Sequence, residues 1–204
     1  RIGQQLNAGM VLEGSVQEEG NRLRITAQLI NVADGFHLWA TNYDREMTGL
    51  FAIQNDVPQQ IVAALKIRLG AGEDQKLRRQ PTDNLEAYKA YLLGLYYWNR
   101  RTAEGMSNAV TQFESSIQQD PKFALAHAML ADAYGSQVGL LKSKEAKAKA
   151  KAASARALEL DDNLAEGHAT LAGRKLWDEW DWEGAEKEYL RALDLNPGYA
   201  TGHQ

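Results

Sequence analysis

The stretch "FALAHAMLADAY" (residues 123–134) is nearly repeated by "LAEGHATLAGRK" (residues 164–175), with small residues, a histidine and a Leu-Ala pair in the same order. A third fragment, "YATGHQ", occupies residues 199–204. Each fragment places a histidine six residues after the end of the preceding segment: His127, His168 and His203. A sequence pattern that recurs at a fixed spacing indicates a repeated structural unit.

The segments before these fragments keep the same spacing. Their end points, Pro121, Asp162 and Pro197, lie 41 and 35 residues apart. Small or aromatic residues precede each end point by 5, 8 and 12 positions: Ser116, Phe113 and Ala109; Ala157, Ser154 and Ala150; Ala192, Tyr189 and Ala185. This register predicts helix pairs that pack through small side chains over everything after about residue 84.

The repeats resemble tetratricopeptide repeats, whose unit is about 34 residues long and whose first helix has Leu-Gly three residues before an aromatic residue. The signature reads Leu93-Gly94 with Tyr97 and Leu130-Ala131 with Tyr134, whereas Lys175 replaces the aromatic residue in the third copy. We therefore expect looser outer packing there. The resemblance implies three helix pairs, at about 84–121, 122–162 and 163–197, with 198–204 starting a fourth.

Residues 10–43 alternate between apolar and polar side chains, as strands with one dry face do. The turn-forming segments "EEGN" (18–21) and "ADG" (33–35) separate three such runs, which predicts a three-stranded antiparallel meander. An apolar stripe that starts at Leu50 predicts a helix over the dry face. Because proline breaks helix interiors, Pro58 predicts a break or kink near Asn55, with Asp56 capping a new helix.

This first part carries a second resemblance. The segments "VLEGSVQEEGNRLRITAQLINVADGFHLWATNYDREM" and "LFAIQNDVPQQIVAAL", about 60 residues in all, are similar to the C-terminal half of the TolB amino-terminal-like domain that precedes tetratricopeptide repeats in many bacterial signalling proteins. The resemblance implies further sheet elements before Arg1 and an upstream adenylate or guanylate cyclase, kinase or winged-helix DNA-binding domain. It also suggests that the sequence is cut at both ends.

The expected fold class is mixed and mainly α: a small α+β domain at 1–70, a charged linker at 71–83, and an α-solenoid of helix pairs at 84–204. Asp83, with Glu86 three residues on, is the candidate capping box at the start of the solenoid.

Composition excludes several kinds of site. The 204-residue chain has no cysteine, which rules out disulfides, thiolate metal sites and cysteine nucleophiles. A net charge of −4 gives no general reason to expect a polyanionic partner, and no apolar run has the length of a membrane span. We expect a cytoplasmic location, with the extracytoplasmic portion of a membrane-anchored regulator as the alternative.

Three clusters could suggest chemistry, and each has a structural explanation. The repeated histidines would lie roughly 8 to 10 Å apart in stacked repeats, too far to share one metal ion, so we interpret them as partly buried packing residues. The lysine run "KSKEAKAKAKAASAR" (142–156) predicts a solvated helix, with nucleic-acid contact as the least favoured alternative. The tryptophans of "WDEWDWEG" (177–184) are expected to lock the third helix pair together rather than form a sugar site, and its acidic residues to face water or begin the second helix.

The sequence has no glycine-rich phosphate loop, nucleophile elbow or ordered catalytic triad, so it predicts no enzyme activity and no cofactor or metal. The favoured function is protein–protein interaction: the first helices of the pairs would line a groove that holds a protein or peptide with an apolar anchor and a basic end. The alternative is an accessory segment that regulates an upstream cyclase or kinase. By the tetratricopeptide resemblance, the groove positions are Tyr88, Tyr91, Leu95, Trp98, Leu125, Ala128, Asp132, Glu166, Ala169 and Gly173. The groove aromatics could instead join the solenoid to the first domain.

A truncated sheet would expose an unpaired strand edge, so the first domain is also expected to form homodimers.

Overall fold

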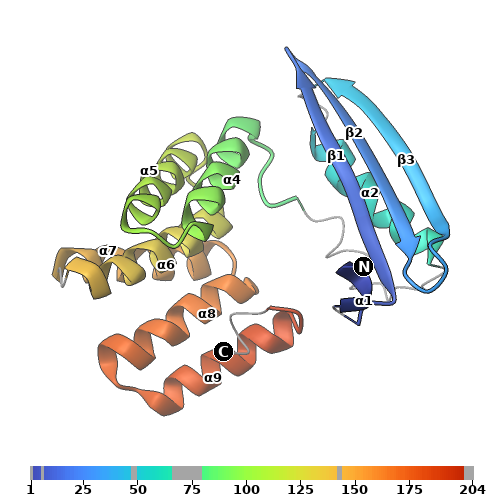
Figure 1. Cartoon of the computed structure of the whole chain (residues 1–204). Coiled ribbons are helices and arrows are strands. Elements are labelled where there is room, and N and C mark those ends of the chain that lie inside the picture. The colour runs from blue at the N-terminus through green and yellow to red at the C-terminus, as the bar shows by residue number, and fades with distance from the viewer. Residues whose placement is uncertain (1, 6, 47–49, 66–79, 142–143, 200–204) are drawn as a thin grey trace. The chain divides into compact units, whose positions relative to one another are not determined.

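The computed structural model describes residues 2–5, 7–46, 50–65, 80–141 and 144–199 (Figure 1). Contacts divide the chain into two compact units, Arg1–Gln80 and Pro81–Gln204. The first combines a three-stranded antiparallel sheet with helix, and the second consists of helix pairs. The expected fold class, a small α+β unit followed by a stack of helices, is confirmed.

The sheet of the first unit is the predicted meander, in the order β1-β2-β3. Strands β1 (Met10–Glu19), β2 (Arg22–Asn31) and β3 (His37–Glu46) follow a short helix, α1 (Ile2–Gln5). Gly20 and Gly35 adopt the positive φ angles, 61° and 71°, that the two tight turns require. The register places Leu12 opposite Leu29 and Val16 opposite Ile25, so the apolar residues share one face.

Helix α2 (Leu50–Ala64) packs against β3 and is continuous through Pro58. The predicted break near Asn55 is therefore wrong. Trp39 of β3 donates a hydrogen bond from Nε1 to Gln60 Oε1 at 3.0 Å, and Gln60 donates to Asp56 at 2.7 Å. The Trp39–Gln60 hydrogen bond and the packing against β3 keep the helix on the sheet where the proline ring removes a backbone donor.

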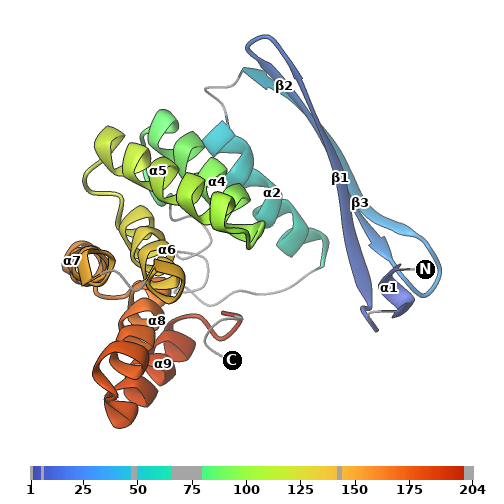
Figure 2. The same cartoon turned by 60° about the vertical axis from the view of Figure 1, so that its left-hand side comes forward.

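Over the described residues 81–141 and 144–199, the second unit forms three helix pairs that stack in sequence order (Figure 2). The first pair is α4 (Leu85–Asn99) with α5 (Ala103–Gln119), and the second is α6 (Ala124–Leu141) with α7 (Lys144–Leu160). In the third pair, α8 (Ala165–Arg174) runs into a π-helical turn, η2 (Lys175–Glu179), before α9 (Trp182–Leu195). Helix α6 is central because it contacts α5, α7 and α8.

Side-chain caps fix where three of these helices begin. The Asn84 side chain accepts a hydrogen bond from the backbone N–H of Ala87, so α4 starts one residue later than the Asp83 cap that the sequence predicts. Thr102 caps α5 in the same way, and Asp181 caps α9 by accepting from the N–H of Gly184 at 2.9 Å. The expectation that an acidic residue of the tryptophan cluster begins the second helix of the third pair is confirmed.

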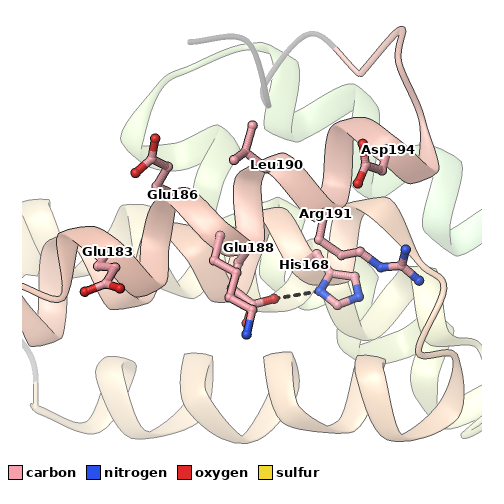
Figure 3. Close-up of a pocket in the computed structure, with 8 residues that line it drawn as sticks. His168, Glu183, Glu186, Glu188, Leu190, Arg191 and Asp194 are labelled. Atoms are coloured by element: carbon pink, nitrogen blue, oxygen red, sulfur yellow. Dashed lines mark hydrogen bonds and ion pairs between the residues drawn. The ribbon is translucent and has the colours of Figure 1, made fainter.

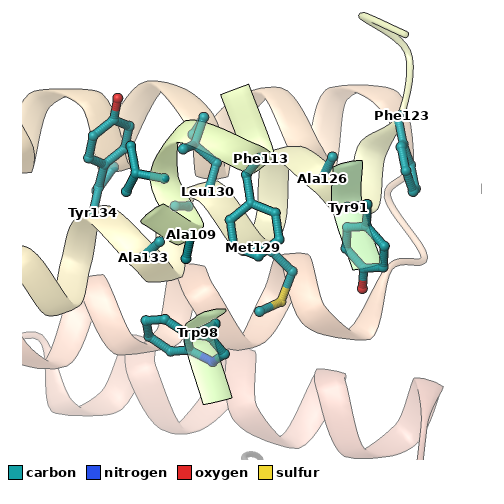
Figure 4. Close-up of a cluster of buried hydrophobic side chains, with 14 of the residues drawn as sticks. Tyr91, Trp98, Ala109, Phe113, Phe123, Ala126, Met129, Leu130, Ala133 and Tyr134 are labelled. Atoms are coloured by element: carbon teal, nitrogen blue, oxygen red, sulfur yellow. The ribbon is translucent and has the colours of Figure 1, made fainter. Parts of the chain in front are cut away.

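The core of the second unit lies where α4, α5 and α6 meet (Figure 4). Phe113 and Phe123 are fully buried, and the Tyr91 ring lies 5.9 Å from Phe113 and 5.1 Å from Phe123 between ring centroids. Ser116 Oγ donates to the carbonyl oxygen of Ala87 at 2.7 Å, which ties α5 to α4 inside the core. The residues at the repeated spacing are thus the contact points between helices.

We predict that Gly94→Ala destabilises the protein although alanine favours helix. A Cβ atom at Gly94 would lie 2.5 Å from the nearest ring atom of Phe113, and Phe113 is fully buried, so the two helices would have to separate. Overpacking of this kind costs about 1–3 kcal/mol. Thermal unfolding followed by circular dichroism should show a lower melting temperature.

Gly135→Ala in α6 is the matched control, because a Cβ there meets nothing within 4 Å. Helix propensity should raise the stability of this variant by up to about 1 kcal/mol. Equal effects of the two substitutions would contradict the close α4–α5 contact.

Candidate functional site

The second unit contains a cavity of about 510 Å³, here named the α6–α8 cavity. Helices α6 and α8 supply most of its walls, and α7, η2, α9 and Tyr199 complete them. Its lining residues are Ala131, Asp132, Gly135, Ser136, Lys147, Ala169, Thr170, Gly173, Arg174, Trp177, Asp178, Tyr189 and Tyr199. This set combines small, aromatic and charged side chains.

The small residues create the space. A Cβ atom at Gly135 would meet no neighbour within 4 Å, and one at Gly173 would meet only the Tyr189 hydroxyl, at 3.5 Å. Trp177, Tyr189 and Tyr199 add aromatic surface beside them. An extended segment of a ligand could therefore lie close to the backbones of α6 and α8, between these aromatic side chains.

Most of the charge in the cavity is already paired. Asp178 forms ion pairs with Lys147 at 3.0 Å and with Arg174 at 3.3 Å. Arg174 and Asp178 are well shielded, with side-chain exposures of 10% and 19%. The three residues form one fixed ionic group that joins α7, α8 and η2.

Asp132 is the exception. Among the described residues, no hydrogen bond or ion pair reaches its carboxylate. Burial, only partly offset by the positive charge of Arg101, raises the pKa of Asp132 to about 6. The Arg101 guanidinium lies over the Trp98 ring, 4.5 Å from its centroid. Near neutral pH the cavity thus holds a partly buried negative charge that has no direct partner among the described residues.

The predicted groove residues divide into two groups. Asp132, Gly173 and the buried Ala169 line the cavity, whereas Tyr91, Trp98 and Ala128 are buried and do not line it. Tyr88, Leu95 and Leu125 are partly buried and pack against the core of α4, α5 and α6. Glu166 is partly buried as well, and burial raises the pKa of its carboxyl. The aromatic anchors expected in the first pair are therefore largely part of the core.

The histidines are packing residues, as the sequence predicts for His127 and His168. His127 is partly buried, and its Nε2 lies 3.1 Å from the carbonyl oxygen of Pro121. His168 uses both ring nitrogens, with Glu188 at 2.7 Å and the Asp162 carbonyl oxygen at 2.9 Å (Figure 3). It lines a wider, open hollow of about 740 Å³ along α9. His203 lies outside the described residues.

The structure confirms the prediction for the lysine run and contradicts the one for the tryptophan cluster. The described lysines of α7 are exposed, and Lys147, Lys149 and Lys151 pair with acidic residues, so the solvated helix is confirmed. The tryptophans do not lock the third pair together: Trp177, Trp180 and Trp182 are 69%, 67% and 61% exposed. The expectation is wrong because the π-helical turn ends at Trp180 with a φ of 58°, and this left-handed residue directs the chain into α9 without burying the indoles.

Sequence reasoning missed the charged wall of the cavity. Lys147 was interpreted as part of a lysine run and Asp178 as part of a tryptophan cluster, although the two are partners. Tyr189 was recognised only as a repeat position. The fixed spacing of the repeats could have found Tyr189, but the ion pair joins segments 31 residues apart and has no sequence signal.

Comparisons give limited likenesses. The chain matches no protein-family model. It is 31% identical over 188 residues to the Rhizobium meliloti (strain 1021) protein described as "Putative adenylate cyclase 3". The match covers 87% of this chain but 31% of that protein, so the chain spans about a third of the relative's length. A solved structure, "First TPR of Spaghetti (RPAP3) bound to HSP90 peptide SRMEEVD", aligns with a TM-score of 0.46 at 18% identity, over 61% of this chain and 90% of that one. In the part of the chain that is described, no helix has both the length and the apolar character to cross a membrane.

We predict that Asp132→Asn stabilises the protein in a pH-dependent way. Because the folded pKa of Asp132 is about 6, above the ordinary 3.8, ionisation costs folding free energy as pH rises from about 4 to 6. Near pH 3 the carboxyl is neutral in both the folded and the unfolded state, so variant and wild type should unfold alike. At pH 7.5 the variant should be more stable by about 3 kcal/mol, measured by urea unfolding.

Asp178→Asn is the control of opposite sign. It removes the partner of Lys147 and Arg174 and should lower stability at pH 7.5. An Asp132→Asn variant that is less stable than wild type at pH 7.5 would mean that the Asp132 carboxylate has a partner in solution.

Proposed function

We propose that the helical unit is a non-catalytic protein-interaction module that binds an extended peptide in the α6–α8 cavity, within the sensory or regulatory part of a bacterial signalling protein. One observation carries the proposal: three of the groove positions expected from the sequence, Asp132, Ala169 and Gly173, come together on the wall of one cavity.

The composition of the cavity favours a peptide. Small residues let a main chain approach the helices, and the aromatic walls offer contact area that loses little side-chain entropy on binding. The ionic group of Lys147, Asp178 and Arg174 fixes one end of the wall, so little rearrangement is needed. A volume of about 510 Å³ suits one or two side chains of such a ligand.

A second candidate is an accessory segment that regulates an adenylate or guanylate cyclase in the same polypeptide. The likeness to the Rhizobium meliloti protein supports it. Both functions use the same cavity and differ in whether the ligand belongs to another protein or to the attached effector.

We also propose that the first unit forms homodimers through β1. This strand pairs with β2 on one side, and no described strand pairs with its other edge. Leu12 and Val16, on the apolar face, are 53% and 66% exposed. An open edge beside exposed apolar side chains can pair with the same edge of a second copy.

The peptide function predicts that filling the cavity abolishes binding. Gly135→Gln and Gly173→Gln should fold, because a Cβ meets little at either position, and each should weaken binding of peptides selected from a random display library by at least about tenfold. Fluorescence anisotropy measures the affinity. Glu186→Gln, at an exposed position in the hollow along α9, is the control and should bind as wild type does.

Failure to select any peptide, or selected peptides that bind both glycine variants with unchanged affinity, would contradict the proposal. Circular dichroism of each variant separates lost binding from lost fold.

The dimer proposal predicts that Val16→Lys shifts the chain to monomer in multi-angle light scattering, because a charge would stand on the exposed apolar face of the pairing strand. Ser15→Lys places the same charge on the opposite face of β1 and should have a smaller effect. A chain without residues 1–80 should be a monomeric helical protein. Wild type that stays monomeric at high concentration would rule the dimer out.

A further inference from the structure

We propose that the carboxylate of Asp132 is the docking point for a cationic side chain, a lysine or arginine of the bound peptide, inside the α6–α8 cavity. The inference rests on the peptide binding proposed above and names the group that this site selects.

Asp132 has no ionic partner among the described residues. The two cations that line the cavity, Lys147 and Arg174, both pair with Asp178 and not with Asp132. Arg101 acts on Asp132 only through its field, since no ion pair joins them among the residues described. A partly buried carboxylate without a counterion has lost part of its hydration, and a cation brought by a ligand would offset that loss.

Aromatic side chains line the cavity that holds the Asp132 carboxylate. The negative charge of Asp132 raises the pKa of Tyr189, together with the larger effect of burial, which places the phenol within electrostatic range of the carboxylate. Trp177 and Tyr199 line the same cavity. Aromatic rings next to a carboxylate attract ammonium and guanidinium groups through their π faces as well as through charge.

The rest of the cavity determines where the cation can lie. Lys147 and Arg174 share the single charge of Asp178, so one excess positive charge remains on that wall. A ligand cation should therefore contact Asp132 and avoid the ionic group. An anionic ligand would do the reverse, which makes it the informative competitor.

The site should be sensitive to pH. Asp132 must be ionised to pair with a cation, and its pKa of about 6 places the change between pH 5 and pH 7.5. The other titratable or charged groups that face it are Lys147 of α7, Arg174 of α8, Asp178 of η2, Tyr189 of α9, Tyr199 and the more distant Arg101. Affinity for a cation should fall roughly tenfold from pH 7.5 to pH 5, because about a tenth of the carboxyl groups remain ionised one unit below the pKa.

The test is an NMR titration of the whole chain with three small probes: N-acetyl-arginine amide, its neutral analogue N-acetyl-citrulline amide, and the anionic N-acetyl-aspartate amide. The amide signals of Gly135, Thr170 and Gly173 report on the cavity. We expect saturable shifts with the arginine probe at pH 7.5. Binding should be at least about tenfold weaker for citrulline, for the Asp132→Asn variant and for wild type at pH 5.

Glu186→Gln serves as the control variant and should leave the arginine titration unchanged. Equal binding of arginine and citrulline, preferred binding of the aspartate probe, or full binding by Asp132→Asn would each overturn the inference. Asp132→Asn is expected to be stable, so loss of binding in that variant cannot be attributed to unfolding.

The outcome for the peptide function is separate. Selected peptides that bind the cavity without enrichment in lysine or arginine would refute the cation site and leave the peptide function standing. Asp132-dependent binding of the arginine probe with no selectable peptide would support the cation site and contradict the peptide function.

Discussion

The helical unit depends on how closely its first two helices approach each other. Gly94 of α4 leaves room for the ring of Phe113 of α5, and the carbonyl oxygen of Ala87 accepts a hydrogen bond from the Ser116 hydroxyl, so α4 and α5 approach each other closely. Phe113 can then reach Tyr91, and through it the core shared with α6. The same use of small residues at α6 and α8 leaves space that no side chain fills, and this space is the cavity.

The repeated register could be predicted from the sequence because helix contacts recur at fixed steps. It located the helix pairs and the packing of His127 and His168, while the resemblance to tetratricopeptide repeats pointed to three cavity residues: Asp132, Ala169 and Gly173. The alternation of residues 10–43 located the strands for the same reason, since a strand has a period of two. Local periodicity is thus a sufficient signal for the secondary-structure elements.

Features that depend on contacts between distant segments could not be predicted. The sequence predicts Trp98 on the groove, but the structure places it in the core. Its burial depends on which side chains of α5 and α6 pack against α4. The ionic group of Lys147, Asp178 and Arg174 needs the third pair to dock on the second. The break at Pro58 was predicted wrongly because packing of α2 on the sheet can offset the cost of a proline inside a helix. A rule based on neighbouring residues alone does not include that packing.

The position of Trp177 gives the protein an optical property. Its indole lines the α6–α8 cavity and is 69% exposed, whereas Trp98 is buried in the core. The emission of an indole shifts to shorter wavelength when water around it is replaced by an apolar group. A molecule that fills the cavity and covers Trp177 with an apolar group should thus shift the intrinsic tryptophan emission to shorter wavelength. Its binding could then be followed without a label on either partner.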